Sequence, residues 1–207
     1  VFAIPNCLIV SVNTPEGHPL TRMCRIPAHG TDIELLERCN ELCRQLCREV
    51  PPLPEAAELV GKLGQDHRSY PTRVLLLGYA AAAAFFTAFY GGTLLDTLCG
   101  GLCGLAGGGW MLWASPRLRF NNLFQTLIGA AIASLLALVL VHMKIGGQLE
   151  AITIGTLMVL VPGMALTNAM REIMVGDIFS GLSRTAESIL TATAIALGVM
   201  VSLAIGN

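Results

Sequence analysis

The chain has 207 residues, of which 54% are hydrophobic and only 13% are charged, and its mean hydropathy is +0.65. Soluble domains average about 25% charged residues, so this composition favours a protein that lies in a lipid bilayer. The formal net charge of −1 and the pI near 6.5 provide no basic surface, which excludes nucleic acid as a partner. Seven cysteines, an odd number, favour a reducing compartment over a disulfide-rich secreted fold.

Residues 1–72 are predicted to form a small cytoplasmic α+β domain, because most of the charged residues lie there. Two apolar runs, 1–14 and 20–26, flank the turn signal Pro15-Glu16-Gly17 and predict a β-hairpin. The sequence starts within the first run and without an initiator Met, so we expect an upstream segment to be missing.

Two helices are predicted after the hairpin. Thr31 and Glu34 have the spacing of a capping box, and apolar residues then recur at helical spacing as far as Pro51. A shorter helix is expected over 54–63, where proline and an acidic residue stand in the first turn.

Neither a metal site nor a catalytic centre is predicted. Cys39, Cys43 and Cys47 recur every four residues, but no CxxC motif or matching histidine pair accompanies them, so we interpret them as core cysteines. No GxSxG, HExxH or P-loop pattern is present. We therefore expect no cofactor and no catalytic residue.

Residues 73–207 are predicted to form a membrane all-α bundle of five transmembrane helices. Crossing the hydrocarbon takes about 20 apolar residues, and five stretches approach this length. Arg117 and Arg119 follow the second stretch, and Arg171 and Arg184 lie near the junction of the fourth and fifth, whereas the opposite side offers only Lys144. The positive-inside rule therefore places the amino terminus in the cytoplasm. The stretches cover 74–92, 94–115, 123–143, 151–175 and 184–206.

Two rows of small residues predict close helix packing rather than binding sites. Residues without bulky side chains at every fourth position let the backbones of two helices approach. The rows are Gly100, Gly104 and Gly108 in the second stretch and Gly129, Ala133 and Ala137 in the third.

The fourth stretch is interrupted by Val161-Pro162-Gly163, which predicts two half-helices. A break exposes unpaired carbonyl groups at one end and N–H groups at the other, and several transporters hold carboxylates and ions there. Thr167 and Asn168 fall in the first turns of the second half-helix. The alternative is that Pro162 only kinks a packed helix.

A polar face is predicted at the start of the last stretch. Ionisable groups at membrane depth usually face a bundle interior or an aqueous path, and here Glu172 or Asp177 could be the partner of an arginine. An arginine that extends to the interface is the alternative. The face consists of Arg184, Glu187, Ser188 and Thr191.

Asp96 is the only formal charge within the second stretch, and Thr93 and Thr97 lie beside it. A carboxylate in this position could bind a proton that drives transport. It could instead reach the water outside the membrane.

The carboxy-terminal part of the chain resembles the threonine/serine exporter family. The match rests on the run Leu160-Val-Pro-Gly-Met-Ala-Leu-Thr-Asn-Ala169 and continues to Leu197-Gly198-Val199. Gly91-Gly92 followed by Asp96 is similar to the family's entry into the second span, and the resemblance covers nearly the whole chain. The chain departs from it at Glu172, where the family often has Asp. Between the two runs the matching residues are Gly176, Asp177, Gly181, Leu182 and Arg184.

This resemblance implies export of small polar carboxylates across a bacterial inner membrane, driven by an ion gradient such as the proton gradient. The fused proteins of the family export threonine and serine, and a split pair exports succinate. It also implies a four-span partner, either fused downstream or a separate subunit. Membrane lipid is a further expected partner, and a homo-oligomer is left open.

We hypothesise that the substrate binds where the broken helix meets the polar face of the last helix, and that nearby carboxylates couple transport to an ion. The substrate-binding candidates are Pro162, Gly163, Thr167, Asn168, Arg184 and Ser188. The ion-coupling candidates are Asp96, Glu172, Asp177 and Glu187.

Two other classes of function are kept as alternatives. The cysteine and histidine content of the first domain raises the hypothesis of a membrane-anchored hydrolase. The glycine rows and the missing four-span portion raise that of a scaffold subunit that does not itself transport.

Overall fold

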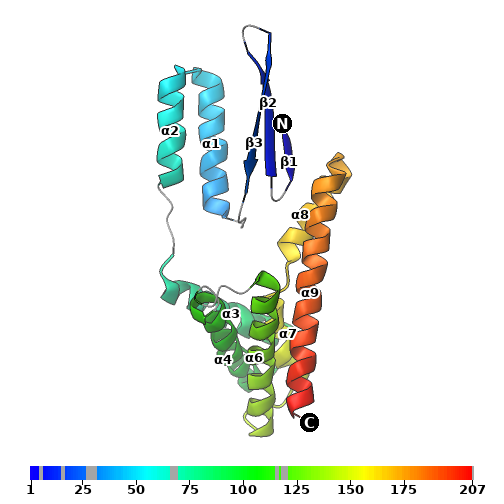
Figure 1. Ribbon diagram of the computed structural model, residues 1–207. Coiled ribbons are helices and arrows are strands. Elements are labelled where there is room, and N and C mark those ends of the chain that lie inside the picture. Colours follow the sequence, from blue (N-terminus) through cyan, green and yellow to red (C-terminus); the bar gives the residue numbers. More distant parts are fainter. Residues whose placement is uncertain are drawn as a thin grey trace. The chain divides into compact units, whose positions relative to one another are not determined.

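The computed structural model describes residues 1–4, 7–14, 17–26, 32–65, 70–114, 117 and 121–206. The chain forms two compact units, Val1–Tyr70 and Pro71–Asn207. The fold is mostly helical, with one small sheet, and both units are shown in Figure 1.

The first unit begins with a three-stranded antiparallel sheet in the order β1 (Phe2–Ile4), β2 (Cys7–Asn13) and β3 (Pro19–Arg25). Strands β2 and β3 form the predicted hairpin, and the Thr14 hydroxyl donates to the His18 carbonyl at 3.0 Å across the turn. The first apolar run is divided into two strands rather than one, because β1 turns back and pairs with β2. Part of the predicted turn, Pro15 and Glu16, lies outside the described residues.

Helices α1 (Ile33–Glu49) and α2 (Leu53–Gln65) follow the sheet and contact each other. The cap of α1 is Asp32, whose carboxylate accepts a hydrogen bond from the Leu35 N–H at 3.0 Å. Asp is as good an N-cap residue as Thr. Because the cap is Asp32 rather than the predicted Thr31, the helix starts one residue later than expected. Thr31 itself lies outside the described residues.

The interpretation of the α1 cysteines as core residues is wrong. Cys39, Cys43 and Cys47 are all exposed, and no residue of α1 is fully buried. Helical periodicity identifies an apolar face but not whether another element covers it. Within the described residues, no group of three His, Cys, Asp or Glu side chains is placed to hold a metal ion.

In the second unit, the structure gives the bounds of seven helical segments among the residues it describes. Helices α3 and α4 pack against each other, α6 packs on α4 and α9, and α7 contacts α3, α4 and α6. The segments are α3 (Thr72–Phe89), α4 (Leu94–Gly109), a π-helical turn η1 (Trp110–Ala114), α6 (Asn122–His142), α7 (Leu149–Met158), α8 (Gly163–Val175) and α9 (Ile178–Gly206).

Small side chains fill the interior of this unit, and large apolar side chains face outward. Ala83, Cys103 and Ala137 are fully buried, whereas Phe85 and Phe89 are 76% and 80% exposed. Soluble proteins bury their large apolar residues, so this distribution is typical of helices that pack in lipid. The predicted glycine row of α4 lies against α3, since a Cβ atom at Gly104 or Gly108 would collide with Tyr79.

Of the helices that the structure describes, three are long and apolar enough to cross a membrane, namely α3, α6 and α9, and the bent pair α7 and α8 would make a fourth. The prediction of five spans is not confirmed. Helix α4 has only 16 residues, fewer than the roughly 20 that cross the hydrocarbon, because the chain changes to a π-helical turn at Trp110. The last helix also starts earlier than predicted, at Ile178, so Arg184 lies within it.

Candidate functional site

The predicted break in the fourth apolar stretch is present. Helix α7 ends at Met158, α8 starts at Gly163, and the two axes differ by 55°. Pro162 lacks a backbone N–H and occupies the N-cap position of α8, where no side chain caps the helix. Its carbonyl accepts the Leu166 N–H at 3.0 Å, so regular helix resumes directly after the proline.

Helix α8 turns back onto α9 and forms a helical hairpin with it. Gly176 ends α8 with a φ of 105°, a conformation that favours glycine. Gly181 then allows close packing, since a Cβ atom there would lie 2.6 Å from the Ala169 carbonyl oxygen. Helix α9 is the principal contact of α8, whereas α7 packs on three helices of the bundle.

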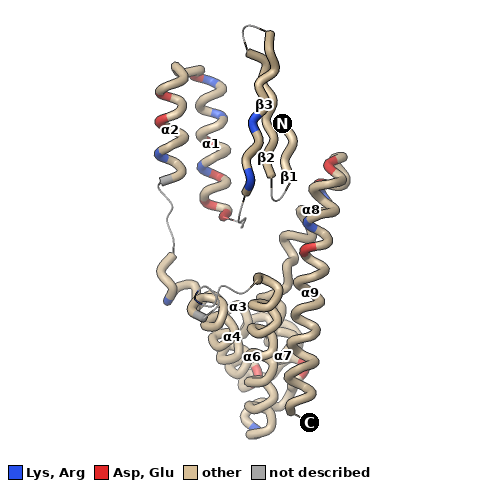
Figure 2. The backbone as a smooth tube through the Cα atoms, in the orientation of Figure 1, with Lys and Arg blue, Asp and Glu red and all other residues tan. Residues whose placement is uncertain are grey.

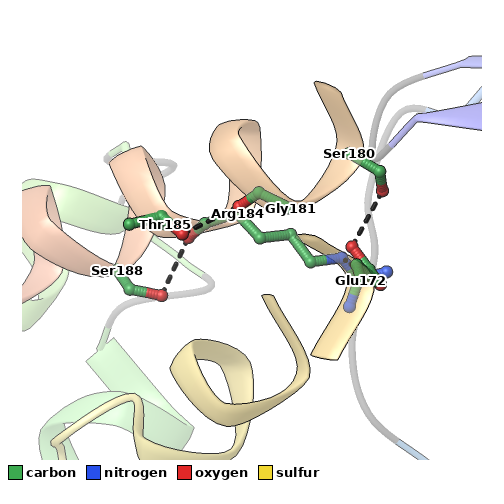
Figure 3. Close-up of polar contacts among 6 residues, drawn as sticks. All are labelled: Glu172, Ser180, Gly181, Arg184, Thr185 and Ser188. Atoms are coloured by element: carbon green, nitrogen blue, oxygen red, sulfur yellow. Dashed lines mark hydrogen bonds and ion pairs between the residues drawn. The ribbon is translucent and has the colours of Figure 1, made fainter. Parts of the chain in front are cut away.

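An ion pair joins the two helices of this hairpin (Figure 3). The Arg184 Nε lies 3.3 Å from the Glu172 Oε1, and the two side chains are 38% and 21% exposed. The Ser180 hydroxyl donates to the other carboxylate oxygen of Glu172 at 2.9 Å. From the sequence, either Glu172 or Asp177 could be the partner of Arg184. In the structure the ion-pair partner of Arg184 is Glu172.

The ion pair leaves hydrogen-bonding capacity unused. The Arg184 Nε is buried and makes no hydrogen bond, although it is within ion-pair distance of Glu172. A buried donor of a charged group that lacks an acceptor is costly, by about 1–3 kcal/mol or more. An anionic ligand that reached this guanidinium would therefore gain both charge pairing and a hydrogen bond.

The hydroxyl groups predicted to line the site bond to their own helices. Thr167 donates to the Gly163 carbonyl at 2.9 Å and Ser188 to the Arg184 carbonyl at 2.9 Å. Both oxygens can still accept a hydrogen bond from a ligand. Asn168 is half-buried on α8.

The two parts of the predicted site lie at different heights along α8. Glu172 is nine residues beyond Gly163, and at 1.5 Å per residue this separates them by roughly 14 Å along the helix axis. Within the described residues, no hydrogen bond or ion pair joins the break to Arg184 or Ser188. The charged cluster and the helix break are therefore two features of one helix pair rather than one pocket.

The other predicted carboxylates are arranged differently. Asp177 is exposed in the turn between α8 and α9, where its N–H donates to the Glu172 carbonyl at 2.9 Å. Glu187 is exposed on α9. Asp96 is fully buried at the start of α4, away from the hairpin in sequence, and accepts hydrogen bonds from Thr93, Gly147 and Gln148.

The charged side chains of this unit are concentrated near the hairpin. Figure 2 marks charged residues on α8 and on the first part of α9, whereas α6 and residues 188–206 of α9 carry no Lys, Arg, Asp or Glu. Ser180 is the contributor that sequence reasoning missed. It stands eight residues after Glu172, and only the glycine turn at 176 indicates that the chain reverses between them.

A family model described as "Putative threonine/serine exporter" matches residues 1–206. A protein of Mycobacterium tuberculosis named "Probable threonine/serine exporter" is 24% identical over 207 residues, which cover 98% of this chain and 38% of that relative. The chain thus spans well under half the length of the relative it matches. No solved structure matches it.

Proposed function

Because the chain belongs to the threonine/serine exporter family, we propose that it is part of a secondary transporter that exports small polar amino acids. The family consists of exporters and not enzymes, so a hydrolase function is set aside. The observation that carries the proposal is the half-exposed pair of Glu172 and Arg184 beside a broken membrane helix. Ionisable groups at such positions usually serve a transport path.

The charges of this pair match those of an amino acid. The zwitterion of an α-amino acid carries a carboxylate and an ammonium group on the same carbon atom. Arg184 offers unused donors for the carboxylate, and Glu172 offers acceptors for the ammonium. The Ser180 hydroxyl, bound to Glu172, is placed to exchange that bond for one with a substrate hydroxyl.

A dicarboxylate such as succinate is the second candidate, and the charge balance argues against it. One carboxylate of succinate could bind Arg184, but the other would meet the like charge of Glu172. Like charges that share a site of low dielectric repel each other strongly. We therefore propose threonine or serine over succinate.

Glu172 is also the carboxylate that we propose for ion coupling. A proton on Glu172 would remove its charge and so weaken its hold on the substrate ammonium group, so that proton uptake would release the bound substrate. Asp177 and Glu187 are further candidates because both are exposed on the same hairpin. A proton gradient is the driving force that this exchange would use.

The substrate path is proposed to continue from the ion pair to the helix break. The N–H groups at the start of α8, which no side chain caps, have the polarity that binds carboxylates. Thr167 and Asn168 on α8, and Ser188 on α9, would contribute acceptors and donors along the way. The break and the ion pair would then be occupied in succession.

The location of the transporter is likewise proposed. The bacterial relative supports a bacterial inner membrane. The arginines at 117, 119, 171 and 184 favour an orientation with the first unit in the cytoplasm. We also propose a further membrane partner, such as a four-span portion or a second copy, because the chain spans only 38% of the length of the relative that it matches.

The test is efflux of labelled threonine, serine and succinate from cells that lack the protein and cells in which it is restored. We expect Glu172→Gln and Arg184→Ala to lower threonine efflux about tenfold or more, since each removes a charge-assisted contact. Asn168→Ala is expected to lower it less. Arg171→Ala is the matched control, because it deletes an exposed arginine next to Glu172.

The result that contradicts the site is unchanged threonine efflux in both Arg184→Ala and Asn168→Ala at equal protein levels. Faster efflux of succinate than of threonine through the intact protein would reverse the choice of substrate class. Efflux that persists after collapse of the proton gradient would refute proton coupling.

A further inference from the structure

Asp96 makes contacts that the transport proposal does not use. Its carboxylate is fully buried and accepts four hydrogen bonds. One oxygen binds the Thr93 N–H at 3.0 Å and the Thr93 hydroxyl at 2.7 Å. The other binds the N–H groups of Gly147 at 2.6 Å and Gln148 at 3.2 Å. The donors come from two parts of the chain more than fifty residues apart.

These donors lie at the starts of two helices. Asp96 is in the first turn of α4, where it completes a capping box with Thr93. Gly147 and Gln148 directly precede Leu149, the first residue of α7. The N-cap residue of α7 is Gln148, and its own side chain makes no capping hydrogen bond. One carboxylate therefore serves the positive ends of both helices.

The loop before α7 is shaped to approach this carboxylate. A Cβ atom at Gly146 would lie 3.3 Å from the Asp96 Oδ1 and 2.7 Å from the Ile152 Cδ1. Ile152 is itself fully buried with Cys99 and Cys103. The absence of a side chain at Gly146 thus allows the backbone to lie between the carboxylate and the core.

We propose that Asp96 is a positioning residue that anchors α7, the first half of the broken helix, at the level of the start of α4. We call the four hydrogen bonds from Thr93, Gly147 and Gln148 to the Asp96 carboxylate the clasp. Helix α7 is held by this clasp and by contacts with three helices, whereas α8 contacts mainly α9. The clasp therefore sets the height of the helix break in the bundle. The inference rests on the proposed function only in that the break belongs to the transport path.

This role differs from that of a proton carrier. Each carboxylate oxygen already accepts two hydrogen bonds from N–H or O–H donors. A proton on either oxygen would place a donor against donors and break part of the clasp. Glu172, which is partly exposed and has one hydrogen bond from Ser180, has no such constraint.

The test uses amide hydrogen exchange in the full chain, which does not depend on transport. In Asp96→Asn the amide keeps one acceptor oxygen, and its N–H₂ group faces either the Thr93 N–H or the N–H groups of Gly147 and Gln148. Exchange at whichever of these amides lose their acceptor is expected to rise on the order of tenfold or more. Glu150→Gln is the matched control because it neutralises an exposed carboxylate in the first turn of α7. Amide exchange in Glu150→Gln should equal that of the unaltered protein. Wild-type exchange in Asp96→Asn would show that the Asp96 carboxylate does not hold these amides.

Threonine efflux then separates positioning from stability alone. Displacement of the break should raise the KM for threonine on the order of tenfold in Asp96→Asn. A lower maximal rate at an unchanged KM would show that Asp96 only stabilises the fold, and would overturn the positioning role. Gly147→Pro removes the N–H group that makes the shorter hydrogen bond to Oδ1, while Asp96 stays charged. Amide exchange at Gln148 and the KM for threonine should both rise in this variant.

The same variants distinguish failure of this inference from failure of the proposed function. If the unaltered protein exports no threonine, the proposed function fails, and the exchange data still decide whether the clasp exists. If export is observed but Asp96→Asn and Gly147→Pro both keep wild-type exchange and KM, the clasp is refuted and the proposed function stands.

Discussion

The packing of α4 on α3 can be tested at a single glycine. A Cβ atom at Gly104 would lie 2.6 Å from the Ala83 Cβ and 2.7 Å from the Tyr79 carbonyl oxygen. Side chains do not approach a backbone oxygen so closely, so Gly104→Ala must push the two helices apart. Overpacking of this kind costs about 1–3 kcal/mol. For a chain of this size, each 1 kcal/mol lowers the melting temperature by about 2–4 °C.

We therefore expect the apparent melting temperature of Gly104→Ala to be about 2–12 °C below that of Gly78→Ala, measured in detergent as the protein recovered by size-exclusion chromatography after heating. Gly78→Ala is the matched control, because nothing lies within 4 Å of a Cβ atom there. An alanine in an open helical position gains about 1 kcal/mol over glycine, so the control should be as stable as the unaltered protein or more stable.

The comparison of these two variants decides the argument. If Gly104→Ala is as stable as Gly78→Ala, then α3 and α4 do not pack through the glycine row as the structure describes. The interpretation of the second unit as a membrane bundle with a core of small residues would then lose its main support.

Two further predictions concern buried and exposed polar atoms. The Ser134 hydroxyl is buried without a hydrogen bond, so Ser134→Ala should leave the free energy of unfolding unchanged or raise it. Ser202→Ala loses a 2.8 Å hydrogen bond to the Gly198 carbonyl and should lower the free energy of unfolding by about 0.5–1.5 kcal/mol. A higher stability of the Ser202 variant would contradict this. A water-soluble maleimide should label the exposed cysteines of the native protein and should label the buried ones only after denaturation, which mass spectrometry of the labelled peptides can measure. The exposed cysteines are Cys24, Cys39, Cys43 and Cys47, and the buried ones are Cys7, Cys99 and Cys103.

Features encoded within a few residues could be predicted from the sequence. The break at Pro162 and Gly163 could be predicted, because proline removes a backbone donor and clashes with the preceding turn of a helix. The glycine row of α4 could be recognised because helical spacing alone places its members on one face. Composition likewise indicated the bilayer, since so few charges cannot cover a soluble surface.

Other features depended on whether an element has a neighbour. The cysteines of α1 follow a regular apolar pattern, but they are exposed because the described part of the first unit does not cover that face. The count of five spans is not confirmed for a related reason: the apolar stretch predicted at 94–115 contains an α-helix of 16 residues that is followed by a π-helical turn. Hydropathy counts residues, whereas crossing a bilayer requires rise along one axis.

The sequence by itself determined that the chain lies in a membrane, that its fourth apolar stretch is broken, and that an arginine and several acids accompany the break. Only the tertiary structure decided that Glu172, rather than Asp177, pairs with Arg184. It alone brought Asp96 to the start of α7. Helix breaks and small-residue rows follow from local geometry, but the partner of a charge depends on how distant segments pack, which no pattern within one segment encodes.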